Sequence, residues 1–345
     1  MALIAKERLI DFGARLLVKK GVSAERAACL APVAVATEAM GIHTHGVVLF
    51  AHWDKFVGDT IDPSAEPEVV AERPATAAID GHASFGQLAL KVGREIAVGK
   101  ARACGVAMVA GRNMSWLAAL TPQILPLAEA GFFAQLWVQD NAYQDCAPWG
   151  GIDPRFSTNP IALAFPTGSL PMVSDFSTSS ISMGKTRVMK RTGQCPPEDL
   201  FLDGAGYPTT NPHVVKNGGS MLFLGGEHYG YRGYALSLWA EALAAMAGGS
   251  CNNPAAPPSQ SFNLTVIDPE AFGSRDHCLA EIQRFIAYMK DNRLRPGFDA
   301  IRLPGERAQA AAREAEARGV FVEDSMVEML NEVAARNGLE GPSLS

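Results

Sequence analysis

The sequence predicts an α/β protein built from two packed parts. Short apolar runs of strand type alternate with helical patterns between residues 76 and 221, and such alternation is typical of α/β domains. Helical patterns dominate residues 1–75 and 222–345. The chain has 345 residues, of which 48% are hydrophobic and 19% are charged. It is therefore long enough for two domains and apolar enough to bury a large core.

The N-terminal part is expected to be helical. Helices are predicted over residues 4–19, 23–40 and 47–58. Ser23 is placed to cap the second helix, because serine is preferred at helix N-caps. Residues 62–74 contain three prolines and are interpreted as a linker.

The central part is expected to hold a sheet. Strands are predicted over residues 76–80, 105–110, 132–138, 161–165 and 171–174, and helices over 87–102 and 117–130. The Asp80-Gly81-His82 segment is interpreted as a turn. Pro122 and Pro126 are expected to break or kink the second helix.

The C-terminal part is expected to be mainly helical again. A helix is predicted over residues 234–246, a proline-containing loop over 252–261 and a late strand over 263–268. Three further helices are predicted over residues 274–291, 305–318 and 323–336.

Charge and hydropathy exclude several functional classes. Thirty basic and 36 acidic residues give a net charge of −6, whereas a nucleic-acid binder needs a basic face. No apolar run reaches the roughly 18–20 residues that span a bilayer, and the N-terminus does not resemble a signal peptide. We therefore expect a cytoplasmic protein that binds neither nucleic acid nor membrane.

Cysteine and glycine motifs of the common kinds are missing from the sequence. The six cysteines form no C-x-x-C pair, so we expect reduced thiols, several of them buried, and no metal site. The sequence also contains no G-x-G-x-x-G after a strand, no P-loop, no H-E-x-x-H and no G-x-S-x-G motif. A nucleotide would have to bind through other residues.

The segment from Gly41 to Gly46 is the first candidate site. Thr44 lies between His43 and His45, and an imidazole beside a hydroxyl suits proton transfer near neutral pH. The alternative is a helix C-terminus at which histidines merely favour the helix dipole.

Polar turns supply four further candidates, each weak alone. Residues 148–151 and 157–160 form glycine and Asn-Pro turns, which suit phosphate or carboxylate contacts or are simply tight turns. Residues 173–179, followed by Gly184-Lys185, offer a carboxylate and hydroxyls to a ribose or a histidine, or form an N-cap cluster. Residues 229–236 and 303–307 are glycine-containing entries to helices, where anions bind.

Taken in order, these motifs resemble one family. The segments GIHTHGVV, APWGG, STNPIALAFP, VSDFSTSS, YPTTNP, GYRGYAL and LPGER are similar to those of the type-2 malate/L-lactate dehydrogenase family, also called the sulfolactate dehydrogenase-like family. The resemblance covers residues 4–336. It implies a non-Rossmann NAD(P)-binding fold, with a mainly helical domain from residues 1–75 and 222–345 and an α/β cofactor-binding domain with a mixed sheet from residues 76–221.

The resemblance also implies an activity and the residues that perform it. The family transfers hydride between NAD or NADP and a 2-oxo, 2-hydroxy or cyclic 2-imino acid, and its members are typically homodimers. His45 falls on the proton donor, Thr44 on its hydroxyl neighbour and Asp175 on the acid of a relay proposed for some members. The residues that fall on cofactor-binding positions are Trp116, Leu117, Ala118, Thr158, Asn159, Asp175, Phe176, Ser177, Gly184, Lys185, Arg232, Gly305, Glu306 and Arg307.

Three departures from the family pattern affect the substrate. Leu49 stands where the family has an arginine for the substrate carboxylate, Trp116 replaces a histidine, and Arg232 replaces a lysine. With His45 and Thr158, Leu49 and Trp116 are assigned to the substrate site. Either Arg232 or Arg187 holds the carboxylate instead, or the substrate is bulkier and more apolar than malate or lactate.

We therefore expect an NAD(P)H-dependent reductase or dehydrogenase acting on a small-molecule ketone or cyclic imine. The alternative is a catalytically degenerate NAD(P)-binding homodimer. Arg187, Lys190 and Arg191 follow the Gly184-Lys185 turn. They favour NADP over NAD if they meet a 2′-phosphate, but they are equally compatible with solvated surface cations.

Overall fold

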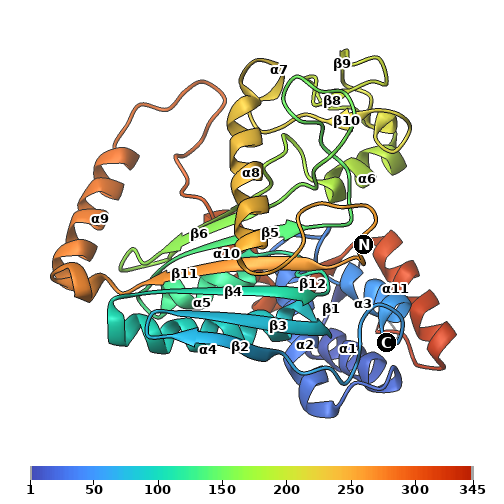
Figure 1. Ribbon diagram of the computed structural model, residues 1–345, viewed down its shortest axis with the longest axis horizontal. Coiled ribbons are helices and arrows are strands. Elements are labelled where there is room, and N and C mark those ends of the chain that lie inside the picture. Colours follow the sequence, from blue (N-terminus) through green and yellow to red (C-terminus); the bar gives the residue numbers. More distant parts are fainter. Residues whose placement is uncertain (1, 343–345) are drawn as a thin grey trace.

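The centre of the molecule is a mixed seven-stranded sheet. The computed structural model describes residues 2–342, and Figure 1 shows the sheet between layers of helices. The strand order is β2-β3-β4-β11-β5-β6-β7. β3 and β4 pair in parallel and the other neighbours pair antiparallel. The strands are β2 (Glu68–Arg73), β3 (Thr76–Ser84), β4 (Val106–Met114), β5 (Phe133–Asp140), β6 (Ile161–Phe165), β7 (Met172–Phe176) and β11 (Gln260–Ile267).

Helices cover both faces of this sheet. α4 (Gly86–Cys104) and α5 (Thr121–Glu129) lie on one face, and α8 (Tyr231–Met246) lies on the other. Phe262 of β11 fits against two glycines, because an added Cβ would lie 2.9 Å from its ring at Gly93 of α4 and 2.3 Å from it at Gly111 of β4. Phe262 is buried there with Ile79 and Val109.

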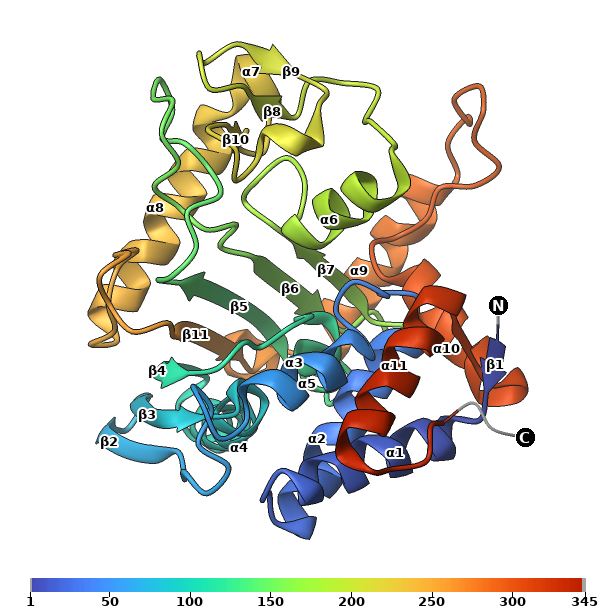
Figure 2. The same ribbon diagram turned by 90° about the vertical axis from the view of Figure 1, so that its right-hand side faces the viewer.

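The helical part joins the two ends of the chain. It contains α1 (Lys6–Lys19), α2 (Ala24–Ala39), α3 (Val48–Phe56), α10 (Glu306–Arg318) and α11 (Asp324–Asn337). A two-stranded sheet pairs β1 (Ala2–Ile4) with β12 (Val320–Val322), so segments from the first and the last part of the chain lie side by side (Figure 2). The Ser23 hydroxyl accepts a hydrogen bond from the backbone N–H of Arg26, which confirms the predicted N-cap of α2.

A small third layer lies over one end of the large sheet. It consists of α6 (Met183–Thr192), α7 (Gly226–Tyr229), the 3₁₀ helix Pro212–Val214 and a three-stranded sheet of β8 (Phe201–Leu202), β9 (Pro208–Thr209) and β10 (Ser220–Met221). It has its own core around Phe201, Met221 and Phe223. The sequence patterns did not predict these elements; each of the three strands is only two residues long, and α6 has only two buried residues, Thr186 and Met189.

Three predicted segments are wrong in part. Residues 62–74 are not only a linker, since Glu68–Arg73 forms the edge strand β2; all six of its residues are exposed, so it has no burial pattern. The predicted turn at residues 80–82 lies inside β3, which continues to Ser84 through positive φ angles at His82 and Ala83. The helix predicted from residue 117 begins only at Thr121, and the apolar residues before it are buried without being helical.

The sheet draws on chain from outside the predicted range 76–221. β2 precedes that range, and β11 follows it yet lies in the middle of the sheet between β4 and β5. The late strand itself was predicted, but the predicted α/β range ends at residue 221 and therefore leaves this strand out. A strand from a distant segment of the chain can pair antiparallel with any strand of a sheet, so its position in the sequence does not reveal its neighbours in the sheet.

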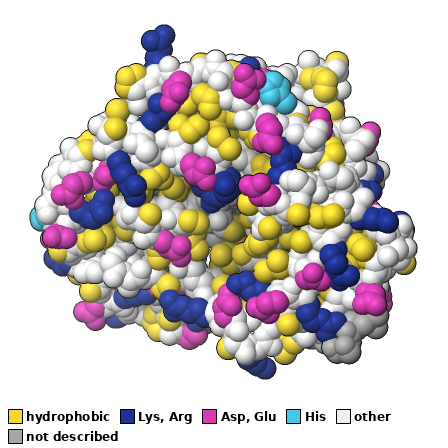
Figure 3. All heavy atoms as spheres, turned by 90° about the horizontal axis from the view of Figure 1, so that it is seen from below, with side chains coloured by type: hydrophobic (Ala, Val, Ile, Leu, Met, Phe, Trp, Pro, Cys, Tyr) yellow, Lys and Arg dark blue, Asp and Glu magenta, His cyan; other side chains and the backbone are white. Residues whose placement is uncertain are grey.

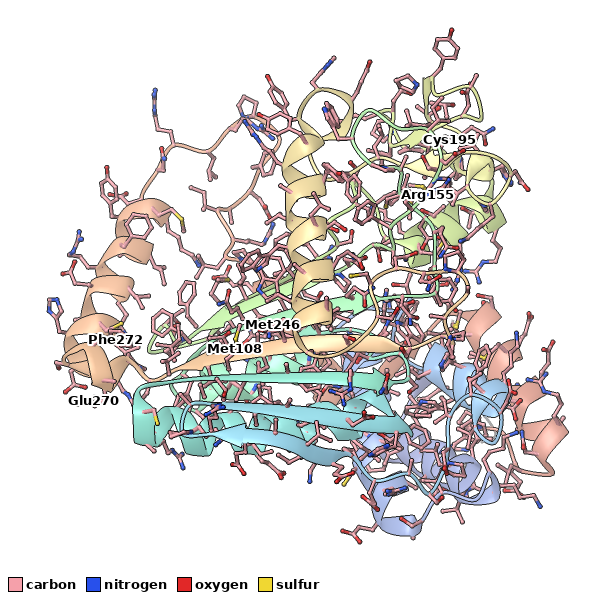
Figure 4. All side chains as sticks on the ribbon, viewed as in Figure 1. Met108, Arg155, Cys195, Met246, Glu270 and Phe272 are labelled. Atoms are coloured by element: carbon pink, nitrogen blue, oxygen red, sulfur yellow. The ribbon has the colours of Figure 1, made fainter. Side chains whose placement is uncertain are left out.

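One helix projects from the body of the molecule. α9 (Arg275–Lys290) follows the 3₁₀ helix Pro269–Phe272 and has no buried residue. Figures 1 and 4 show it away from the sheet, with Phe272 labelled at its base. On the face seen in Figure 3, acidic and basic side chains are interspersed. No helix within residues 2–342 is long and apolar enough to cross a membrane.

The six cysteines are free thiols. Only Cys146 is buried, whereas Cys104, Cys195 and Cys251 are exposed, so the expectation of several buried thiols is wrong. The exposed cysteines lie in loops or at a helix end, where the sequence offers no apolar periodicity from which burial could be read.

Candidate active site

The strand ends gather at one edge of the large sheet. Gln260, the first residue of β11, pairs with Met114 at the end of β4 and with Asp140 at the end of β5. Ile161, the first residue of β6, pairs with Phe176 at the end of β7. Side chains that follow or end these strands are therefore brought together although they lie far apart in the sequence.

A cavity of about 930 Å³ opens at this edge. Its walls come from the end of α2 and the loop after it, from the strand ends, and from α6, α10 and α11. Twelve of the residues predicted from the sequence line it, namely Thr44, His45, Trp116, Ala118, Thr158, Asp175, Phe176, Ser177, Gly184, Lys185, Gly305 and Arg307. The fold thus brings most of the predicted site together.

The loop that carries His45 is fastened to α2 by a buried carboxylate. One oxygen of Glu38 lies 2.5 Å from His43 Nδ1, and the other accepts a hydrogen bond from the backbone N–H of Val47. Hydrogen bonding to Glu38 raises the pKa of His43. Gly46 is required here, because a Cβ at that position would lie 2.1 Å from the Glu38 carboxylate.

His45 is held between a hydroxyl and an aromatic ring. Thr44 Oγ1 and His45 Nδ1 are 2.7 Å apart, and the centroids of the His45 and Trp116 rings are 5.4 Å apart. Burial, with a smaller contribution from the charge of Arg187, lowers the pKa of His45 to about 4. His45 is therefore neutral at pH 7, and Nε2 is the ring nitrogen left to exchange a proton with a ligand.

The N-terminus of α6 packs directly on this loop. Ser182 caps the helix by accepting a hydrogen bond from the Lys185 N–H. A Cβ at Gly184 would lie 2.7 Å from Thr44 Cβ. Arg187 lies three residues after Gly184, so it is on the same helix face, beside the loop.

Asp175 caps α5 rather than contacting His45. Its Oδ2 accepts hydrogen bonds from the backbone N–H groups of Leu120 and Thr121, at 2.8 and 2.9 Å, and one from the Thr121 hydroxyl. Burial raises the pKa of Asp175. The relay from Thr44 and His45 to Asp175 that the resemblance suggested is therefore not formed by hydrogen bonds among the described residues.

The cavity wall also carries a second carboxylate, which the sequence analysis missed. Asp140 Oδ2 accepts a hydrogen bond from the Gln260 side chain, whose Oε1 in turn accepts one from the Leu117 N–H. Burial raises the pKa of Asp140 to about 6. Only the strand register brings Asp140 and Gln260 together, so no local sequence pattern could have revealed the pair.

Five predicted site residues do not line the cavity. Leu117 and Asn159 are buried behind it, and Asn159 donates hydrogen bonds to Ser237 and Glu241. Glu306 pairs with Lys290. The remaining two, Leu49 and Arg232, were assigned to the site on the strength of the family motifs.

Leu49 and Arg232 are placed away from the cavity for different reasons. Leu49 is fully buried in the helical core; successive helix residues are turned by about 100°, so Val48 lines the cavity and Leu49 does not. Arg232 is exposed at the start of α8, where its guanidinium lies 4.9 Å from the Tyr229 ring centroid.

His52 is a second histidine that sequence reasoning missed. Its ring centroid lies 5.2 Å from that of Trp116 and 4.6 Å from that of Phe56. Burial, followed by the charges of Lys55 and Arg187, lowers the pKa of His52 to about 4. Trp116 thus contacts two imidazole rings that are neutral at pH 7.

The cavity fits a phosphate-containing cofactor. The N-termini of α6 and α10 line it through Ser182 and Gly305, and helix N-termini attract phosphate groups. Lys185 and Arg307 add positive charge beside them. The volume is at the upper end of the range of ligand pockets, roughly 300–1,000 Å³, so it accommodates a cofactor together with a small substrate.

Comparison with known proteins gives matches along almost the whole chain. The family model of malate/L-lactate dehydrogenase matches residues 4–331. A malate dehydrogenase of Pyrococcus horikoshii is 31% identical, and the alignment covers 98% of this chain and 96% of that protein. A Δ1-pyrroline-2-carboxylate/Δ1-piperideine-2-carboxylate reductase of Pseudomonas syringae pv. tomato is 32% identical and covers 96% of each chain.

The fold is also found among solved structures. The structure of malate dehydrogenase from Pyrococcus horikoshii OT3 has a TM-score of 0.89 at 29% identity, and the superposition covers 99% of this chain and 97% of that one. The similarity therefore concerns the full architecture and not one motif.

Proposed function

The chain belongs to the malate/L-lactate dehydrogenase family, and on this premise we propose that it is an NAD(P)H-dependent reductase or dehydrogenase for a ketone or cyclic imine. The observation that carries the proposal is the neutral, half-buried His45 beside Trp116 in a cavity with two helix N-termini. An oxidoreductase of the malate/lactate dehydrogenase type needs a hydride carrier and a proton-exchanging group side by side; the helix N-termini suit the phosphates of such a carrier, and His45 is the proton-exchanging group.

Different residues of the cavity bind the cofactor, exchange the proton and exclude water. The helix N-termini of α6 and α10 bind and orient the phosphates, with Lys185 and Arg307 beside them. The nicotinamide supplies or takes up the hydride when it is bound. His45 takes the proton of a substrate hydroxyl or amine at Nε2, or returns it in the reverse direction. Trp116 excludes water from the substrate side.

The neutral state of His45 favours some substrates and reaction directions over others. A pKa of about 4 leaves few rings protonated at pH 7, so His45 is a base in the resting protein. This suits oxidation of a hydroxyl, and it suits reduction of a cyclic imine that already carries its own proton. The Trp116 wall favours a body that is bulkier and more apolar than malate or lactate, because burial contributes about 25 cal/mol per Å².

The proposal includes NADP as the preferred cofactor. Lys190 donates to the carbonyl of Val215 and Arg191 pairs with Glu323 at 3.6 Å, so the support for a 2′-phosphate comes from Lys185 and Arg307. The preference is tested by comparing kcat/KM for NADPH and NADH. Replacement of Arg307 by Met should lower the value for NADPH more than that for NADH.

The activity is tested by following oxidation of NADH and NADPH with a panel of acids. The panel contains pyruvate, oxaloacetate, phenylpyruvate and Δ1-piperideine-2-carboxylate. We expect turnover of the ring-bearing compounds and poor turnover of pyruvate and oxaloacetate. Binding of NADPH without turnover of any compound would favour the alternative, a catalytically degenerate NAD(P)-binding homodimer.

We propose that the protein is a homodimer. Large apolar side chains are exposed on α8, at Trp239 and Met246, and on the projecting α9, at Phe285 and Tyr288. Exposed apolar groups of this size mark interaction surfaces. Light scattering should give twice the chain mass, and a monomer at micromolar concentration would contradict the proposal.

A further inference from the structure

The substrate of the proposed reaction needs a cation for its acid group, and the chain lacks an arginine at position 49. An arginine and a carboxylate form a two-point, charge-assisted hydrogen bond. Leu49 has no such group and is buried in the helical core. The cation must therefore come from another element of the cavity wall.

Arg187 is the cation that the fold places beside His45. It lies one turn into α6, on the face that Gly184 presses against Thr44, and it lines the cavity. Among the cations of residues 2–342, it is the one whose charge contributes to the lowered pKa of His45. Its charge also lowers the pKa of His52, whose ring contacts Trp116 as well.

The guanidinium of Arg187 is available to a ligand. Within residues 2–342 it forms no ion pair and no hydrogen bond with another residue, and it is exposed to solvent. Arg191, one turn further along α6, is already paired with Glu323. Arg232, the other candidate, lies against Tyr229 and Tyr231 outside the cavity.

We propose that Arg187 binds the substrate carboxylate, with the reacting C=O or C=N group at His45 and the rest of the substrate against Trp116. This inference rests on the proposed function and names its substrate class, a 2-oxo or cyclic 2-imino acid with one carboxylate. Asp140 lines the same cavity, so a second carboxylate would meet an acidic wall. Arg187 is thus a residue that determines substrate specificity.

The test measures binding and not turnover, so that it stands apart from the activity itself. Picolinate has a planar ring with a nitrogen beside its carboxylate, and picolinamide has the same ring with a neutral group. Affinities of the full-length protein for both probes are measured by calorimetry, with and without NADPH. The unmodified protein should prefer picolinate about ten- to a hundredfold, the range expected for a charge-assisted hydrogen bond.

Two variants and one control decide the assignment. Arg187→Met should abolish the preference for picolinate, and Arg187→Lys should retain part of it, because lysine keeps the charge but not the two-point geometry. Arg155→Met removes an equal charge from an exposed arginine outside the cavity (Figure 4) and should retain the preference. Thermal unfolding confirms that each variant is folded.

Two results would overturn the assignment of Arg187. One is an unmodified protein that binds picolinamide as well as picolinate, and the other is an Arg187→Met variant that still prefers picolinate. If the preference behaves as expected but no acid is turned over, the proposed function fails and the carboxylate site remains.

Discussion

At the scale of single residues, His45 is defined by where its ring lies. Burial beside Trp116 lowers the pKa of His45 to about 4, so the imidazole is unprotonated at neutral pH. In the oxidation direction kcat/KM should therefore rise through about pH 4 and be level at pH 7, since this parameter reports the ionisation of the free enzyme.

His45→Ala is expected to lower turnover by about 10²–10⁴-fold, the usual contribution of a general acid or base. Nucleotide affinity should not change, because the phosphates are assigned to α6 and α10. Steady-state rates and the fluorescence of bound NADPH measure the two quantities separately. A variant with near-normal turnover would remove His45 from the mechanism.

Asp175 is expected to act on stability through α5. Its carboxylate accepts three hydrogen bonds from Leu120 and Thr121, so Asp175→Ala leaves buried donors unsatisfied, at about 1–3 kcal/mol. Asp175→Asn keeps one acceptor and should lose less. Urea unfolding measures both. Equal stability of both variants and the unmodified protein would contradict the cap.

The residue scale also shows the limit of motif reasoning. His45, Thr158 and Phe176 were predicted from motifs, and all three line the cavity. Their motifs form a loop or a strand end, and the fold alone places these backbone segments at the cavity. Leu49 was assigned to the substrate site by its alignment with an arginine, and the structure buries it in the core. A leucine is stabilised by burial among apolar side chains, whereas an arginine at the same position would be directed to solvent or to a ligand.

At the scale of elements, the contact between α6 and the His45 loop leaves no room for a larger side chain at Gly184. Gly184→Ala would place a Cβ 2.7 Å from Thr44 Cβ, so α6 must shift away from the loop. We expect kcat to fall and the affinity for picolinate to weaken, because Arg187 moves with the helix.

Gly99→Ala is the matched control, since a Cβ there meets nothing within 4 Å. Gly99 lies within α4, and alanine in a helix interior is favoured over glycine by about 0.5–1 kcal/mol. This variant should be slightly more stable and equally active. Comparable kinetics of the two variants would contradict the tight packing of α6.

Most elements that bury one face were predictable, and the exposed or very short strands were missed. The α2 helix shows both its cap and its apolar face in the sequence, and β6 was found with its exact bounds. β2 has six exposed residues, and β8, β9 and β10 have two residues each. Hydrophobic periodicity carries no information about such strands.

At the scale of the whole molecule, His52 makes stability depend on pH. The unfolded state binds a proton at about pH 6.5, whereas the folded state binds it at about pH 4. The unfolded state therefore holds more protons between these values, and the folded state is destabilised as the pH falls from 6.5 to 4. His45 behaves in the same way, while Asp140, with its pKa raised to about 6, acts in the opposite direction.

A difference measurement isolates the contribution of His52. His52→Phe keeps the ring contacts with Phe56 and Trp116 but does not titrate. The melting temperature of the variant relative to the unmodified protein should rise steadily as the pH falls from 6.5 to 4, because the effect of Asp140 is common to both. A constant difference over this range would show that burial does not perturb His52.

The position of β11 has a consequence for how the chain folds during its synthesis. The central strand of the sheet leaves the ribosome after β4 and β5, the two strands that it separates. Until residue 267 has emerged, both nascent strands have an unpaired edge, and such edges pair with one another or with other chains. A nascent chain that has emerged only as far as residue 259 should therefore be protease-sensitive and bound by chaperones, and emergence of the next eight residues should reduce both properties.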